Sequence, residues 1–374
     1  MLPQMAQLFP SQDNSIISWI LNLIWVGSFV VVIFYGQRIQ MYLTLKEVEG
    51  SLMRLRIMRD EARKTAIATI KELGKPQVDP SARVDQFLEY IVITPEAMDP
   101  AGIVWKLDQL LDVMDDRFKD EVRLMAPAAD ESITNNLENT LGAAQGLNII
   151  YKTIKHFYLL GKKTWSLYIV MQLQMVMPLI MREAEAIENH VKASANGQPI
   201  GDGVGALVAA KLMHGHPQRD ITKDCVVAEI SFEGRKAFVL KAKGPGGNVG
   251  RPGSAMSEII EENGGKIAIV IGIDAKGKLE GEKVGEIAEG VGVPIGGPGT
   301  ESFKVEETVL KYKIPVYAVA IKEDSWDVSS AMRREIAESV DPAIERVKRV
   351  ILERTKEGDS VIIAGIGNTM GVGQ

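Results

Sequence analysis

The chain has 374 residues and a formal net charge of −6, and its length predicts two or three domains. It contains no block of basic residues interleaved with aromatic ones, so the composition excludes an ordinary nucleic-acid-binding surface. The single cysteine, Cys225, excludes an intrachain disulfide and a cysteine-based metal cluster.

The first element in chain order is an uncharged apolar stretch, residues 16–35, with the sequence IISWILNLIWVGSFVVVIFY. As a helix it is about 30 Å long, which matches the apolar core of a bilayer. A cleaved signal peptide starts with basic residues, and no Lys or Arg precedes this stretch. We therefore predict a retained transmembrane helix at 16–35 after a short extracytoplasmic tail at 1–15. Basic residues cluster from Arg38 to Lys64, so the positive-inside rule places the amino end outside the cell membrane and the bulk of the chain in the cytoplasm.

The next stretch, residues 36–81, is predicted to form a helical stalk. Apolar residues recur there every three or four positions, and the sequence GKPQVDPS ends the pattern. Residues 82–195 are predicted to form a helical domain with helices at 101–125, 131–161 and 164–191.

The last of these helices contains an uncharged run, residues 164–181, for which two interpretations stay open. The run is long enough to be a second membrane span. Gln172, Gln174 and Pro178 lie within it and favour a buried helix of a helical bundle instead.

From residue 196 to 374 the pattern alternates between strands and helices. This alternation predicts an α/β domain with a mostly parallel sheet and helices on both faces. Glu233-Gly234 is expected to join two strands as a hairpin. The predicted strands are 224–232, 236–243, 266–274, 314–322 and 360–368, and the predicted helices are 203–214, 254–263 and 329–356.

The chain stops directly after its last predicted strand, where a helix would be expected. That strand delivers Gly365-Ile-Gly367-Asn368, and the helix at 203–214 begins with Gly201-Asp202-Gly203-Val-Gly205. Placed one after the other, these motifs resemble the start of the hydrogenase maturation proteases and the spore germination protease family. The resemblance covers 197–374 in circularly permuted order. It implies a phosphorylase/hydrolase-like fold in which Gln374 lies near Gly197 and the 203–214 helix packs beside the last strand.

Two acidic residues carry the chemistry that this resemblance implies. By motif, the catalytic pair corresponds to Asp202 and to Asp274 of Ile-Asp-Ala, both expected beside the carboxyl ends of strands. Two carboxylates in one cleft can activate a water, protonate a leaving amide, or bind a divalent metal. The alternative is structural, with Asp202 capping a helix and Asp274 ending a strand. No histidine follows His216, so nickel recognition of the hydrogenase maturation type is not expected.

Two Gly-rich segments flank these acids and are candidate ligand-binding loops. Bare backbone N–H groups at a helix start can cradle an anion, and a purely structural turn is the equal alternative. The predicted ligand-binding residues are Gly244, Gly246, Gly247, Asn248, Gly250 and Arg251 in the first segment, Gly296, Gly297 and Gly299 in the second, and Asn368 after the last strand.

The whole chain resembles an archaeal membrane-anchored family defined only as a domain of unknown function. We expect a membrane-anchored cytoplasmic hydrolase, a peptidase that uses the acidic pair. The alternative is a non-catalytic scaffold, or a protein that binds an anion or another small ligand and forms homo-oligomers through its helical region. A purely structural membrane assembly is the third hypothesis. The expected partners are the lipid bilayer, a further copy of the chain, and a peptide or small anionic ligand.

Overall fold

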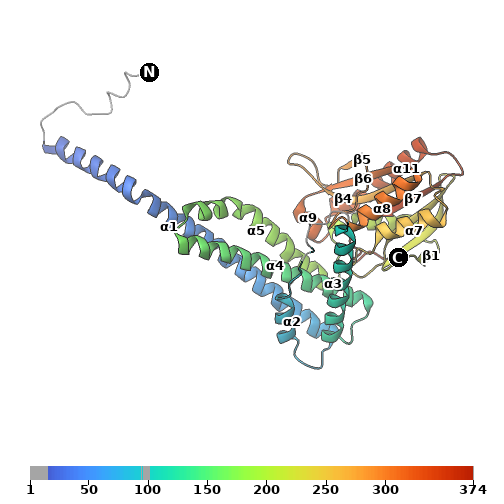
Figure 1. The fold of residues 1–374 in the computed structure, drawn as a ribbon, viewed down its shortest axis with the longest axis horizontal. Helices are drawn as coiled ribbons and strands as arrows, with labels where there is room; N and C mark the ends of the chain where they lie inside the picture. Colours follow the sequence, from blue (N-terminus) through green and yellow to red (C-terminus); the bar gives the residue numbers. More distant parts are fainter. Residues whose placement is uncertain (1–15, 94, 96–101, 374) are drawn as a thin grey trace, which may run out of the picture. The chain divides into compact units, whose positions relative to one another are not determined.

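The computed structural model describes residues 16–93, 95 and 102–373, and for 16–18 and 32–34 it describes the backbone only. The predicted tail, 1–15, lies outside the described residues. A helical region is followed by an α/β domain, as the sequence predicts (Figure 1). The helical region consists of α1 (Ile16–Thr69), the π-helical turn η2 (Ile70–Gly74), α2 (Ser81–Leu88), α3 (Ile103–Met125), α4 (Glu131–Thr164) and α5 (Leu167–Ala195).

The chain forms two compact units, and the first consists of the start of α1, up to Arg54, and the tip of the α4–α5 hairpin, Tyr151–Ile180. On α5, Val170, Leu173 and Met177 are buried at helical spacing. Tyr168, Met175 and Leu179 on the same helix are exposed. The helix at 164–181 is therefore buried along one stripe, and both interpretations of this run stay predictions.

The apolar part of α1 is the candidate membrane span. Within the described residues, no single helix meets the length and hydropathy needed to cross a bilayer on its own. The segments Trp19–Val31 and Tyr35–Gly74, which are bent by 58° relative to each other, satisfy those requirements only when they are taken together.

The second unit contains Leu55–Ile150 and the chain from Met181 onward, including the sheet. The strands are β1 (Gln218–Asp220), β2 (Cys225–Phe232), β3 (Arg235–Ala242), β4 (Ile269–Gly277), β5 (Ile287–Val291), β6 (Val316–Glu323) and β7 (Ser360–Gly365), in the spatial order β1-β2-β3-β7-β4-β6-β5. The four central strands are parallel, whereas β1, β2 and β5 pair antiparallel with their neighbours. The predicted mostly parallel sheet is therefore wrong, because the sheet is mixed. The hairpin at Glu233-Gly234, whose two residues have positive φ, turns β2 back along β3, and β5 is a short, largely exposed edge strand.

Helices cover both faces of this sheet. They are α6 (Val204–Met213), α7 (Pro252–Glu262), α8 (Thr300–Tyr312), α9 (Ser325–Ser329), α10 (Arg334–Glu338) and α11 (Val340–Arg354). One apolar core joins α6, α10 and α11 to one face, and a second joins α7 and α8 to the other. The single helix predicted at 329–356 is wrong, since the chain forms a bridge at Ala331 and restarts as α10 and α11. Pro342 lies in the first turn of α11, where a missing N–H is tolerated.

The last strand, β7, occupies the middle of the sheet, between β3 and β4. The predicted neighbour relationship is confirmed, because α6 packs directly on β7. The approach is so close that a Cβ at Gly205 would overlap the carbonyl oxygens of Ile273 and Ile366. Gly371 lies against Pro199 and the carbonyl of Gly197. Gln374 itself lies outside the described residues.

Candidate functional site

Asp202 lies in a short 3-10 turn, η3 (Gly201–Gly203), which leads into α6. Its carboxylate accepts a hydrogen bond of 2.7 Å from the backbone N–H of Asn368. Asn368 belongs to the loop that follows β7, so this bond ties the start of α6 to the end of the chain. The helix-capping interpretation of Asp202 is therefore replaced by a contact with the carboxyl-terminal loop.

Asp274 lies within β4, three residues before that strand ends. Its Oδ1 accepts a hydrogen bond of 2.8 Å from the N–H of Ala275. By strand alternation, Asp274 shares a face with Val270, which belongs to the α7–α8 core. Ile273, the residue before it, accepts a hydrogen bond of 2.8 Å from the N–H of Ile366. Asp274 therefore stands where β4 and β7 reach the same edge of the sheet.

Both aspartates line one cavity of about 300 Å³. Burial, together with the charge of Asp202, raises the pKa of Asp274 to about 8. Burial also raises the pKa of Asp202, while the Asn368 N–H works against that rise. The remaining lining residues are Leu111, Asp115, Val249, Gly250, Arg251, Pro252, Ile295, Gly296, Gly297, Pro298, Gly299, Thr300, Glu301, Ile366 and Gly367.

Glu323 is an acidic residue that the sequence reasoning missed. It ends β6, next to β4, and its side chain is 0% exposed. Within the described part of the chain, neither carboxylate oxygen has a hydrogen-bond partner. Burial raises the pKa of Glu323 to about 8, with contributions from Asp202, Asp327 and Asp274. The rule that selected Asp274, an acid at the carboxyl end of a buried strand, would also have found Glu323.

Gly201 allows the chain to pass close to the buried carboxylate of Glu323. A Cβ at that position would overlap the Glu323 carboxylate and the backbone carbonyl of Asp327. Asp327 is buried as well, and Arg333 forms an ion pair with it at 3.3 Å. The start of η3 thus lies directly over two buried acids.

The acids do not form a metal centre. Across the described stretches of the chain, no three His, Cys, Asp or Glu side chains are placed to share one ion. One oxygen of Asp202 already accepts the Asn368 hydrogen bond. The residues present therefore do not fit the divalent metal that the sequence allowed.

The first half of the Gly-rich segment 243–253 is occupied by internal contacts. The hydroxyl of Thr369 donates to the carbonyl of Gly246 at 2.8 Å. The Gly247 N–H donates to Asn136 of α4 at 2.8 Å, and the Gly247 carbonyl accepts from Asn139 at 2.6 Å. At Gly244, a Cβ would overlap the carbonyl of Val372. These glycines join the carboxyl-terminal loop to α4, so the alternative of a structural turn describes this half of the segment.

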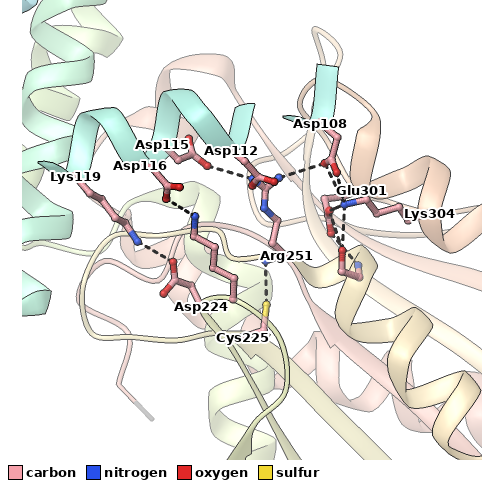
Figure 2. Close-up of polar contacts among 12 residues, drawn as sticks. Asp108, Asp112, Asp115, Asp116, Lys119, Asp224, Cys225, Arg251, Glu301 and Lys304 are labelled. Atoms are coloured by element: carbon pink, nitrogen blue, oxygen red, sulfur yellow. Dashed lines mark hydrogen bonds and ion pairs between the residues drawn. The ribbon is translucent and has the colours of Figure 1, made fainter. Parts of the chain in front are cut away.

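Arg251, predicted as an anion ligand, is held by aspartates of α3 (Figure 2). Its guanidinium pairs with Asp112, with Asp115 at 3.4 Å and with Asp108 at 3.6 Å. Lys304 of α8 pairs with Asp108 as well, at 2.9 Å. The positive charge of Arg251 is therefore already balanced by α3, which does not favour the anion site expected at this residue.

A second cavity, of about 270 Å³, lies next to the first and shares Asp115, Val249, Gly250 and Arg251 with it. Five predicted ligand residues line it, namely Gly247, Asn248, Gly250, Arg251 and Asn368. Glu138 of α4 also lines this cavity, and burial raises its pKa to about 7. The predicted residues are thus divided between two adjoining cavities, and Gly244 and Gly246 line neither.

Comparison with known proteins gives a family and no further relative. The model described as the protein of unknown function (DUF1512) N-terminal domain matches residues 22–197. The model described as the domain of unknown function (DUF1512) C-terminal matches residues 200–373. No curated protein and no solved structure matches the chain. The chain therefore belongs to the DUF1512 family, whose N-terminal and C-terminal domains it contains in that order.

Proposed function

We propose that the chain is a membrane-anchored hydrolase of the peptidase type that uses Asp202 and Asp274 as an acidic pair. The observation that carries the proposal is the shared cavity, in which the pKa of Asp274 is raised to about 8 partly by the charge of Asp202. Two interacting carboxyl groups that hold one proton between them provide an acid and a base at neutral pH.

The two acids take different roles in this mechanism. Burial raises the pKa of Asp202, but the Asn368 N–H opposes that rise, whereas the described residues give Asp274 no such donor from another segment. We therefore assign Asp202 as the general base that removes a proton from water. The water oxygen forms a bond to the carbonyl carbon of the substrate. Asp274, protonated below pH 8, gives its proton to the leaving nitrogen as the C–N bond breaks. The proton taken by Asp202 then restores the shared-proton state of the pair.

The second Gly-rich segment supplies part of the cavity wall. Gly296, Gly297 and Gly299 lead into α8, and its first residue, Thr300, lines the cavity. A helix N-terminus carries partial positive charge, which would stabilise the developing charge on a carbonyl oxygen. A volume of about 300 Å³ is at the lower end for ligand pockets, so the proposed substrate part is small, such as one end of a peptide.

Membrane anchoring is the second part of the proposal, with the amino end outside and the α/β domain in the cytoplasm. Its support is the uncharged sequence of 16–35 and its exposure. Trp19, Leu23 and Trp25 are each more than 60% exposed, as lipid-facing side chains would be. The hydrolase part of the proposal has a separate support, which is the resemblance of the motifs in 197–374 to those of the germination proteases in permuted order.

The test uses the full chain in lipid vesicles. Peptides from a digested proteome are incubated with it in ¹⁸O-labelled water, and new carboxyl termini are detected by mass spectrometry. We expect labelled termini from the natural chain, and their loss, by at least 100-fold, with Asp202→Asn or Asp274→Asn. Asp341→Asn, a change on the surface of α11, is the matched control and should keep the activity.

The alternative is a binding protein without turnover, or a scaffold that forms homo-oligomers. Peptide binding that survives both Asp→Asn changes, with no ¹⁸O incorporation by the natural chain, would replace the hydrolase proposal with this one. The predicted homo-oligomer stays a prediction.

A further inference from the structure

The tip of the α4–α5 hairpin, residues 151–171, carries positive charge and no negative charge. Lys152, Lys155, Lys162 and Lys163 lie in it, and no Asp or Glu occurs from Tyr151 to Met181. The chain as a whole has a net charge of −6, so this segment departs sharply from the rest. Such local reversal of charge marks a surface for an anionic partner.

The same tip exposes large aromatic and apolar side chains. Trp165 is 66% exposed and Tyr168 is 71% exposed, and Phe157 and Leu159 are exposed as well. Lysines beside exposed tryptophan and tyrosine are the composition found where proteins meet the headgroup layer of a bilayer.

The tip contacts α1 at the point where its uncharged stretch ends. Gln40 donates a hydrogen bond of 3.7 Å to the sulfur of Met171. Trp165 and Leu167 share a cavity with Arg38, which is the first charged residue after the apolar stretch. From Tyr35 to Gln40 a helix rises by about 8 Å, which is within the thickness of a headgroup layer.

We infer that the hairpin tip, residues 151–171, rests on anionic lipid headgroups beside the membrane anchor. Trp165 and Tyr168 enter the interface, and Lys162 and Lys163 pair with lipid phosphate or carboxylate groups. A second copy of the chain is the less favourable occupant, because four lysines would face four lysines. The inference rests on the membrane anchoring proposed above and is independent of the acidic pair.

The test places a polarity-sensitive thiol dye at Tyr168→Cys in the full chain. The native Cys225 is buried and does not compete for the dye. Leu310→Cys, on an exposed position of α8, is the matched control. Both chains are reconstituted into phosphatidylcholine vesicles with and without phosphatidylserine, and the vesicles carry a quencher attached near the headgroup.

We expect the dye at position 168 to shift to shorter wavelength and to be quenched at least twofold more than the dye at 310. Phosphatidylserine should increase the difference, and Lys162→Gln with Lys163→Gln should reduce it. Equal quenching at both positions in chains that float with the vesicles overturns the hairpin inference and leaves the anchor intact. A blue shift without lipid quenching assigns the tip to a second copy and also overturns it. If the natural chain does not float with the vesicles, the membrane anchor and this inference are both overturned. Absence of hydrolysis would affect only the proposal for the acidic pair.

Discussion

The backbone N–H of Asn368 donates a hydrogen bond to the carboxylate of Asp202, although the two residues are 166 positions apart in the chain. The bond joins the loop after β7 to the start of α6. The strand and the helix therefore form one strand–loop–helix unit in space, although α6 comes first in the sequence. The bond also fixes the loop after β7, in which Ile366 and Gly367 line the same cavity as Asp274. The geometry of the candidate site therefore depends on the close packing of α6 on β7.

That packing leaves no room for a side chain at Gly205. In Gly205→Ala the new methyl group would overlap the carbonyls of Ile273 and Ile366, and we expect a loss of about 3 kcal/mol in the free energy of unfolding. Chemical denaturation followed by a probe in the α/β domain measures it. Gly142→Ala is the matched control, since Gly142 is also within a helix and has no atom within 4 Å of its added Cβ. The control should be neutral or more stable by up to about 1 kcal/mol, and an equal loss in both variants would contradict the packing.

The buried acids predict that stability falls as pH rises. Asp274 and Glu323 have pKa values of about 8 in the folded chain, whereas an unfolded carboxyl group titrates near pH 4. Between these pH values the folded state binds more protons than the unfolded state, so the stabilisation is present at pH 4 and is lost as pH rises through 8. Melting temperatures of the α/β domain at a series of pH values measure this slope. Glu323→Gln should reduce the slope and raise the melting temperature at pH 8, and an unchanged slope would show that Glu323 does not titrate there.

The attachment of α3 depends on Arg251. In Arg251→Gln three aspartates of α3 lose their shared partner, and we expect a loss of about 2 kcal/mol in the stability of that contact. Hydrogen exchange along α3 should become faster. Arg219→Gln, which breaks an exposed pair with Glu262, is the control and should change stability by less than about 1 kcal/mol. Unchanged exchange in α3 would mean that the aspartates do not hold it.

The carboxyl-terminal loop is fixed by a buried hydroxyl. In Thr369→Val the carbonyl of Gly246 loses a hydrogen bond of 2.8 Å, which should cost about 1 kcal/mol and speed hydrogen exchange at Gly371 and Val372. Thr164→Val, at the exposed end of α4, is the comparison and should leave exchange in this loop unchanged. If both variants behave alike, the hydroxyl does not anchor the loop.

Much of the α/β domain could be predicted from sequence because its strands are unbroken apolar runs. The hairpin at Glu233-Gly234, the strands β4, β6 and β7, and the pairing of α6 with β7 follow from local pattern and motif order. The edge strands β1 and β5 could not be found that way, since their exposed residues have no apolar alternation. This is why the sheet was expected to be mostly parallel.

In the candidate site, too, residues marked by a local sequence pattern could be predicted, whereas contacts between distant segments could not. Asp202 and Asp274 were found because each follows a recognisable Gly-rich or strand-end pattern. The partners of Arg251 were not predictable, because Asp108, Asp112 and Asp115 come from a helix more than a hundred residues earlier and their pairing depends on how α3 packs. Glu323 ends β6 in register with Gly277 of β4, three residues beyond Asp274, and no glycine-rich motif in the sequence marks it.

The most direct test of the central claim is a carboxyl titration of Asp274 in the full chain, labelled with ¹³C at aspartate and held in lipid nanodiscs. The resonance is assigned by its absence in Asp274→Asn. The acidic pair predicts a midpoint near pH 8 in the natural chain, and a lower midpoint in Asp202→Asn because the neighbouring negative charge is gone. A midpoint near pH 4, or one that does not change in Asp202→Asn, would show that the two carboxyl groups do not act as a pair.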